Sequence, residues 1–151
     1  MRIPDEIYKR IVRAKRFIDE NFQEPIDLDA IAGEACLSRF HFHRLFRRIY
    51  RRTPHEYLTR RRIGEALRML QAEQYATVGA VCAQVGFESI GSFSMLFKKA
   101  TGVAPGEYRE RCRIRRTAAA EQPRLVIPYC FIDEIAGEKS NNQEGRKPGM
   151  E

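Results

Sequence analysis

The segment FHRLFRRIYRRTPHEY at residues 42–57 recurs 51 positions later, without a gap, as FSMLFKKATGVAPGEY at residues 93–108. The arginine pair at 47–48 is matched by the lysine pair at 98–99. Upstream of the two copies, IAGEACLS resembles VCAQVGFES once one extra residue is allowed in the second turn. The repeat therefore predicts two copies of one unit, in which a short helix, a tight turn and a longer helix form a helix-turn-helix.

Helical periodicity continues outside the repeat. From Ile7 to Phe22, hydrophobic residues recur at spacings of three and four, which predicts an amphipathic first helix. No strand pattern appears before the C-terminal tail. We expect an all-α fold with three parts: a first unit with a linker helix at residues 5–71, a second unit at 72–116, and a short irregular tail at 117–151 that begins as a linker.

Capping residues mark where two of the helices begin. Ser38 is a natural N-cap for an arginine-rich helix that runs to about Ile49. In TPHE, Thr53 can cap the next helix, proline fits its first position, and Glu56 closes a capping box back onto Thr53. This linker helix is expected to run to about Gln71 and to join the two units.

The charge distribution indicates an anionic partner. The chain of 151 residues is 43% hydrophobic, enough for one domain or two very small ones, and its formal net charge is +7. The excess lies in residues 38–68, which contain ten arginines and two glutamates. Such a block favours nucleic acid or a membrane surface as partner.

The sequence also indicates where the protein resides. No stretch is long and apolar enough to span a membrane, and the first residues lack the apolar core of a signal peptide, so we expect a cytoplasmic protein. The four cysteines are widely spaced, so we expect no disulfide framework.

The helix that follows Ser38 has one apolar side and one basic side. The apolar stripe predicts that the opposite side faces outward, with arginine, histidine and one aromatic residue exposed. Guanidinium groups match the O6 and N7 edge of guanine, and an aromatic ring matches a thymine methyl group, so this side suits a major-groove reader. Burial of the aromatic residue under the first helix remains an alternative. The inward residues are Phe42, Leu45, Phe46 and Ile49, and the outward ones are Arg39, Phe40, His43, Arg44 and Arg47.

Three motifs resemble the DNA-binding module of the AraC/XylS family of bacterial transcription regulators. They are IA..ACLS...F.RLF at 31–46, RRRIGEALRML at 60–70 and VGFES...FS..FKK..G..P.EYR at 85–109. The chain is similar to the small members of the MarA, SoxS and Rob type. The resemblance implies about seven helices, two units on one face of the double-stranded DNA, binding as a monomer to an asymmetric site, association with the nucleoid, and recruitment of RNA polymerase as an activator.

The resemblance also assigns roles to residues, unit by unit. In the first unit it implies base reading by the outward aromatic, histidine and arginine of the helix expected at about 38–49. In the second unit, base reading falls on the helix expected at about 89–101. The base-reading candidates are Phe40, His43, Arg44, Ser92 and Met95, and the candidates for phosphate or flanking contacts are Ser38, Arg39, Arg47, Arg48, Arg61, Lys98 and Lys99.

The second unit departs from the family pattern. Met95 stands where the family usually has arginine, and Gly91 offers no side chain. A methionine provides only an apolar contact, so we expect the second unit to contribute phosphate binding through Lys98 and Lys99, with weak base discrimination. The first unit should therefore dominate base readout. Gly64, inside the linker helix, either lets the two units adjust their angle or marks a close packing point.

Other functions are less well supported by the sequence. His41 and His43 point about 200° apart on a helix, so we expect no metal site, and no pattern indicates a catalytic site or a cofactor. The arginines at 60–62 are expected on a solvated face or on phosphates. Two alternatives remain open: a protein-binding module for RNA polymerase or another regulator, and an architectural DNA-binding protein of low specificity. In the tail, the apolar run from Leu125 to Ile135 is a candidate contact for an unidentified protein or ligand.

Overall fold

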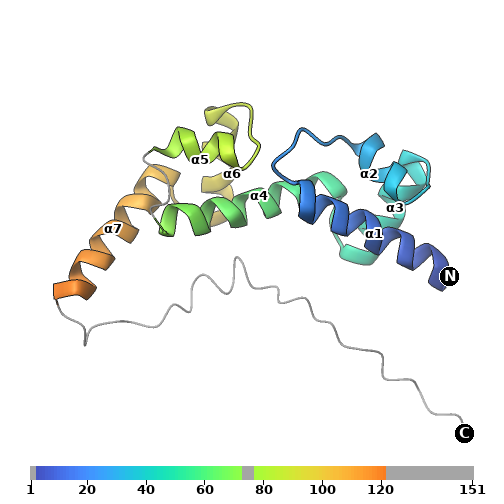
Figure 1. Ribbon diagram of the computed structural model, residues 1–151, viewed down its shortest axis with the longest axis horizontal. Coiled ribbons are helices and arrows are strands. Elements are labelled where there is room, and N and C mark those ends of the chain that lie inside the picture. The colour runs from blue at the N-terminus through green and yellow to red at the C-terminus, as the bar shows by residue number, and fades with distance from the viewer. Residues whose placement is uncertain (1–2, 73–76, 122–151) are drawn as a thin grey trace, which may run out of the picture.

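The structure is a computed structural model, and it describes residues 3–72 and 77–121 (Figure 1). Within these residues the regular secondary structure consists of helices alone, as expected for an all-α fold. In chain order they are α1 (Asp5–Asn21), α2 (Leu28–Glu34), α3 (Arg39–Tyr50), α4 (Pro54–Gln71), α5 (Val78–Gln84), α6 (Ile90–Thr101) and α7 (Pro105–Glu121). The helices α2 and α3 form the first helix-turn-helix, α5 and α6 form the second, and α4 joins the two units.

Polar caps fix the beginnings of five helices. The Ser38 hydroxyl accepts a hydrogen bond from the His41 amide at the start of α3. At the start of α4, Thr53 and Glu56 form the predicted capping box, with a 2.7 Å bond from the Thr53 amide to the Glu56 carboxylate. Each cap satisfies an amide that would otherwise have no partner in the first turn, a contribution of about 1 kcal/mol. The three remaining caps are Asp27, Thr77 and Ser89.

The two units share their backbone turns as well as their helices. The turn between the paired helices has a residue with positive φ in each unit, Cys36 at 52° and Gly86 at 87°. The residue that ends the longer helix is also left-handed in each unit, Arg51 at 58° and Gly102 at 82°. The second unit thus has glycine at both positions, where a side chain is strained, while the first unit has side chains there. The one-residue difference in turn length inferred from the sequence is confirmed.

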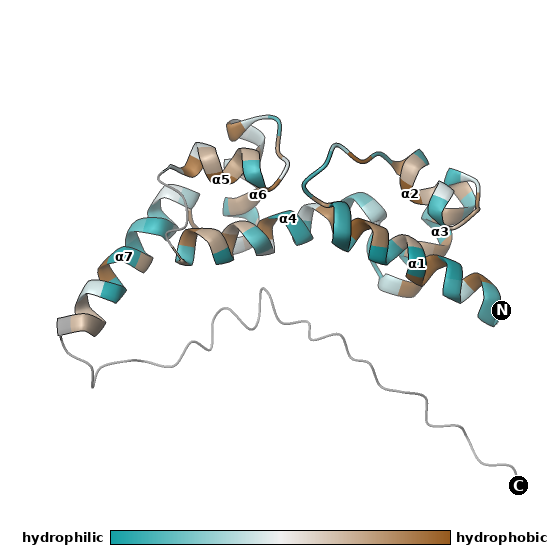
Figure 2. Cartoon of the chain, viewed as in Figure 1, coloured by the Kyte–Doolittle hydropathy of each residue, from teal (hydrophilic) through white to brown (hydrophobic). Residues whose placement is uncertain are grey.

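Each unit has a hydrophobic core of its own. Figure 2 shows hydrophobic residues along the helices of both units. The linker helix α4 contributes to both cores. Leu58 packs in the first core, and the buried residues of α4 from Ile63 onward pack in the second. The aromatic residues of the repeat occupy matching places in the two cores. The ring of Phe46 lies 5.4 Å from Phe42 and 5.7 Å from Tyr57, and that of Phe97 lies 5.6 Å from Phe93 and 5.7 Å from Tyr108.

The C-terminal helix corrects one expectation. α7 continues to Glu121, so residues 117–121, which we expected to begin a linker, are helical. Their sequence, TAAAE, consists mainly of alanine, the strongest helix former, which explains the extension. The apolar run from Leu125 to Ile135 lies outside the described residues.

Candidate nucleic-acid interface

The outward side of α3 has the composition expected for a base-reading surface. Phe40 has 76% of its surface exposed, so it is not buried under α1. Arg44 and Arg47 are exposed on the same helix, and His43 is half-buried. The inward residues Phe42, Leu45 and Phe46 are buried, as predicted. The outward side lines a surface depression of about 530 Å³, bounded by Ser38, Phe40, His41, His43, Arg44 and Arg47.

The arginines of α3 differ in their intramolecular partners. Arg39 lies 3.7 Å from the carboxylate of Asp29 on α2, and its guanidinium lies 5.1 Å from the centre of the Phe40 ring. In the described part of the chain, by contrast, no carboxylate is within ion-pairing distance of Arg44. Among residues 3–72 and 77–121, no carboxylate therefore competes with an external acceptor for the donors of Arg44, whereas Arg39 is already partly neutralised.

The outward side of α6 is largely apolar. Ile90 is 55% exposed and Met95 is 64% exposed. Ser92 is exposed as well, and its amide donates a hydrogen bond to the hydroxyl of the N-cap Ser89. Positive charge on α6 is confined to its last turn, where Lys98 and Lys99 lie exposed. The structure therefore separates exposed apolar side chains in the first half of α6 from cations in its last turn.

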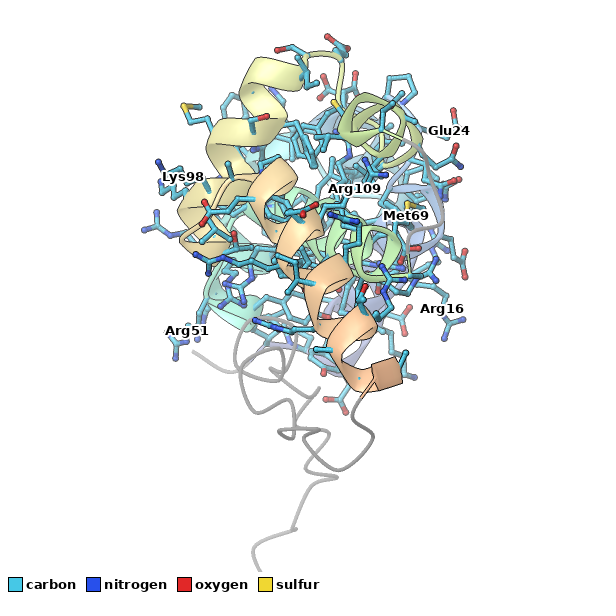
Figure 3. The ribbon with its side chains drawn as sticks, turned by 90° about the vertical axis from the view of Figure 1, so that its left-hand side faces the viewer. Arg16, Glu24, Arg51, Met69, Lys98 and Arg109 are labelled. Carbon is cyan, nitrogen blue, oxygen red and sulfur yellow. The ribbon has the colours of Figure 1, made fainter. Side chains whose placement is uncertain are left out.

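The C-terminal ends of α3 and α6 lie on one side of the molecule. Figure 3 shows Lys98, at the end of α6, and Arg51, at the end of α3, on the same side. Arg16 on α1 and Glu24 after it lie on the opposite side (Figure 3). A single extended ligand can therefore contact the ends of both helices at once.

The arginines of the linker helix are positioned differently from what the sequence suggested. The guanidinium of Arg61 lies 4.3 Å from the centre of the Phe22 ring and 3.5 Å from the carboxylate of Glu65. Arg62 is half-buried and donates hydrogen bonds to backbone carbonyls after α1, so the expectation of a solvated or phosphate-binding residue is wrong for Arg62. In the sequence, Arg60 and Arg62 belong to a run of three arginines, and nothing in that run predicts that Arg62 is half-buried while Arg60 is exposed.

Two other kinds of site are absent from the described residues. No group of three or more histidine, cysteine, aspartate or glutamate side chains is arranged to hold a metal ion in residues 3–72 and 77–121. Among the same residues, no helix is both long enough and apolar enough to cross a membrane.

Comparisons with known proteins place this geometry in a family. A family model described as a helix-turn-helix domain matches residues 31–111. The bifunctional transcriptional activator/DNA repair enzyme AdaA of Bacillus subtilis is 30% identical over 116 residues, which are 77% of this chain and 54% of AdaA. The transcriptional activator AarP of Providencia stuartii is 33% identical over 93 residues, 62% of this chain and 68% of AarP. The chain therefore spans about half the length of the Bacillus relative.

A solved structure supports the same assignment. The DNA-binding domain of AdpA, a global transcriptional factor, was determined in complex with a target DNA. It superposes with a TM-score of 0.67 and 29% sequence identity, covering 71% of this chain and 96% of that domain.

Proposed function

The chain belongs to the AraC/XylS family of helix-turn-helix transcription regulators, and we propose that it recognises a specific duplex sequence by placing α3 and α6 in successive major grooves. The observation that carries this proposal is the outward side of α3, where Phe40 and Arg44 are exposed beside His43. Phosphate binding alone would require only positive charge. An exposed aromatic ring among the cations suits contact with base edges.

In the first unit, we propose a specific DNA contact for each outward side chain of α3. Arg44 donates two hydrogen bonds to the O6 and N7 atoms of a guanine, the commonest specific contact in the major groove. Phe40 packs against a thymine methyl group, and His43 contacts an adjacent base. The cations and the hydroxyl around them bind phosphates and so position the helix. These phosphate candidates are Ser38, Arg39, Arg47 and Arg48.

In the second unit we propose weaker base discrimination. Met95 and Ser92 are exposed in the first half of α6 and contact bases, while Lys98 and Lys99 bind phosphates. Arg61 is a weaker candidate for a phosphate contact, because Glu65 already neutralises part of its charge. The recognised site should therefore have one strongly specified half and one weakly specified half.

The linker helix supports binding as a monomer. α4 has 18 residues, which at about 1.5 Å each span about 27 Å. This length is comparable to the roughly 34 Å between successive major grooves on one face of DNA, so one chain can do what a helix-turn-helix dimer does. Because AdaA and AarP are named activators, we also propose that this protein activates transcription, with RNA polymerase as its partner.

The experiment that tests this function is selection of bound sequences from a pool of random duplexes at physiological salt. We expect enrichment of a motif with one sharply specified half and a vaguer half about one helical turn (10–10.5 base pairs) away. Absence of any enriched motif, together with binding that disappears as salt rises, would contradict sequence-specific recognition. That result would favour a protein-binding module; tight binding without an enriched motif would favour an architectural protein.

A further inference from the structure

The two helix-turn-helix units meet at a polar contact beside the linker helix. We call this contact the junction, and it comprises Arg62 of α4, residues 22–24 after α1, and residues 86–87 between α5 and α6. In Figure 1, the segment between α1 and α2 and the segment between α5 and α6 face each other beside α4. Since the units have separate hydrophobic cores, the relative position of α3 and α6 depends on α4 and on this junction.

Arg62 connects three segments at the junction. Its Nε donates a 2.6 Å hydrogen bond to the carbonyl oxygen of Phe22, and its Nη2 donates a 2.9 Å hydrogen bond to that of Glu24. The guanidinium also lies 5.7 Å from the centre of the Phe87 ring in the second unit. Burial lowers the pKa of Arg62, but an arginine remains charged at any physiological pH. Hydrogen bonds from a charged donor are roughly twice as strong as neutral ones.

Gly86 brings the two backbones into direct contact. A Cβ atom at this position would lie 2.5 Å from the carbonyl oxygen of Gln23 and 2.9 Å from its carbonyl carbon, both of which belong to the first unit. The residue also has a φ of 87°, which residues other than glycine rarely adopt. The helix-turn-helix turn of the second unit is therefore seated on the chain that follows α1.

The linker helix α4 is not sufficient to fix the relative position of the two units. At Gly64, in the middle of α4, an added Cβ atom would meet no heavy atom within 4 Å, so this glycine is not a close packing point. A glycine inside a helix weakens it by about 1 kcal/mol relative to alanine. The junction lies beside this part of α4 and adds contacts that a bare helix would lack.

We propose that the junction sets the distance and the rotation between α3 and α6, so that the protein accepts a single spacing between its two half-sites. This inference rests on the proposed function. Inserting one base pair between the half-sites moves the second by about 3.4 Å along the DNA and rotates it by about 36°. If the junction holds the units rigidly, the second unit cannot follow that displacement. Arg62 then acts as a positioning residue for recognition, although it does not itself face the DNA.

The test measures affinity for the selected sequence and for versions with one base pair inserted or removed between the two halves. The variants are Arg62→Met, which keeps the apolar stem without the donors, and Arg62→Lys, which keeps the charge without the fork of donors. Arg60→Met is the matched control, because Arg60 is exposed on the same helix. We expect both Arg62 variants to reduce the preference for the original spacing by about tenfold, the factor that corresponds to one hydrogen bond from a charged donor. Arg60→Met should leave the preference unchanged.

Other outcomes would overturn the inference. If an Arg62 variant only destabilises the fold, affinity should fall by the same factor for all spacings, and the preference should remain. An equal reduction by Arg60→Met would also contradict a role for the junction. If the unmodified protein binds the selected sequence specifically but tolerates every spacing, the junction proposal fails while the proposed function stands. Absence of sequence preference in the unmodified protein would overturn both.

Discussion

Replacing Arg44 with alanine should weaken binding to the selected sequence much more than binding to random DNA. Arg44 is exposed, and within the described residues no carboxylate pairs with it. The substitution therefore breaks no ion pair among these residues. The expected cost is that of one bidentate contact to guanine, about 1–3 kcal/mol, or about 5- to 150-fold in affinity. Arg39→Ala should cost less than Arg44→Ala, because Arg39 is already ion-paired with Asp29.

The assay is a fluorescence-anisotropy titration of each variant against the selected duplex and against a scrambled duplex of the same composition. Arg16→Ala removes the same charge from an exposed position on the side opposite Arg51 and Lys98 (Figure 3), so it corrects for the general electrostatic contribution. The ratio of the two affinities should fall for Arg44→Ala and stay constant for Arg16→Ala. If Arg44→Ala weakens both duplexes by the same factor, Arg44 contacts phosphate and the base-reading role is refuted.

Three further predictions concern charge, backbone strain and pH. Replacing Lys98 and Lys99 with alanine should make DNA binding less sensitive to salt. In titrations over a salt series, the slope of log affinity against log salt concentration should decrease in magnitude by about 0.9 for each phosphate that is no longer bound. An unchanged slope would exclude both lysines from the DNA interface. Because Arg51 has a φ of 58°, Arg51→Gly should raise the free energy of unfolding by about 1 kcal/mol, and Gly102→Ala should lower it by a similar amount, in urea denaturation. Burial raises the pKa of Tyr50 to about 12, so the unfolded chain loses this proton first and stability should fall between about pH 10 and pH 12; Tyr50→Phe should remove that part of the decline in thermal melts.

Local sequence signals predicted most of the architecture. The repeat identified both helix-turn-helix units, because the same aromatic, proline and tyrosine positions recur where the two cores need them. The caps at Ser38 and Thr53 were predictable because the bonding partner lies only three residues away. The exposure of Phe40 was the more open question. It depended on where α1 packs, and helical periodicity determines which side of a helix faces inward but not which neighbour covers its edge.

The junction was not predictable, for physical reasons. Arg62 binds carbonyl oxygens 38 and 40 residues earlier in the chain, and a backbone carbonyl has no signature in the sequence. Arg60 and Arg62 are the same residue type, and their positions relative to the end of α1 decide that one is exposed and the other half-buried. The extension of α7 through residues 117–121 was missed for a different reason. The segment TAAAEQP after Arg116 was interpreted as a linker, although its alanines favour continuation of the helix.

The separation of the interior into two cores has a consequence for how the molecule unfolds. Proteins open in cooperative segments that follow their buried contacts, and here the buried hydrophobic contacts form two sets, connected by α4 and by the polar junction beside it. We expect amide hydrogen exchange to divide the chain into two groups with distinct opening free energies, one on each side of the boundary between Leu58 and Ile63. The less stable unit can then open while the other remains folded, and protease cleavage under native conditions should begin in that unit and leave the other as a resistant fragment.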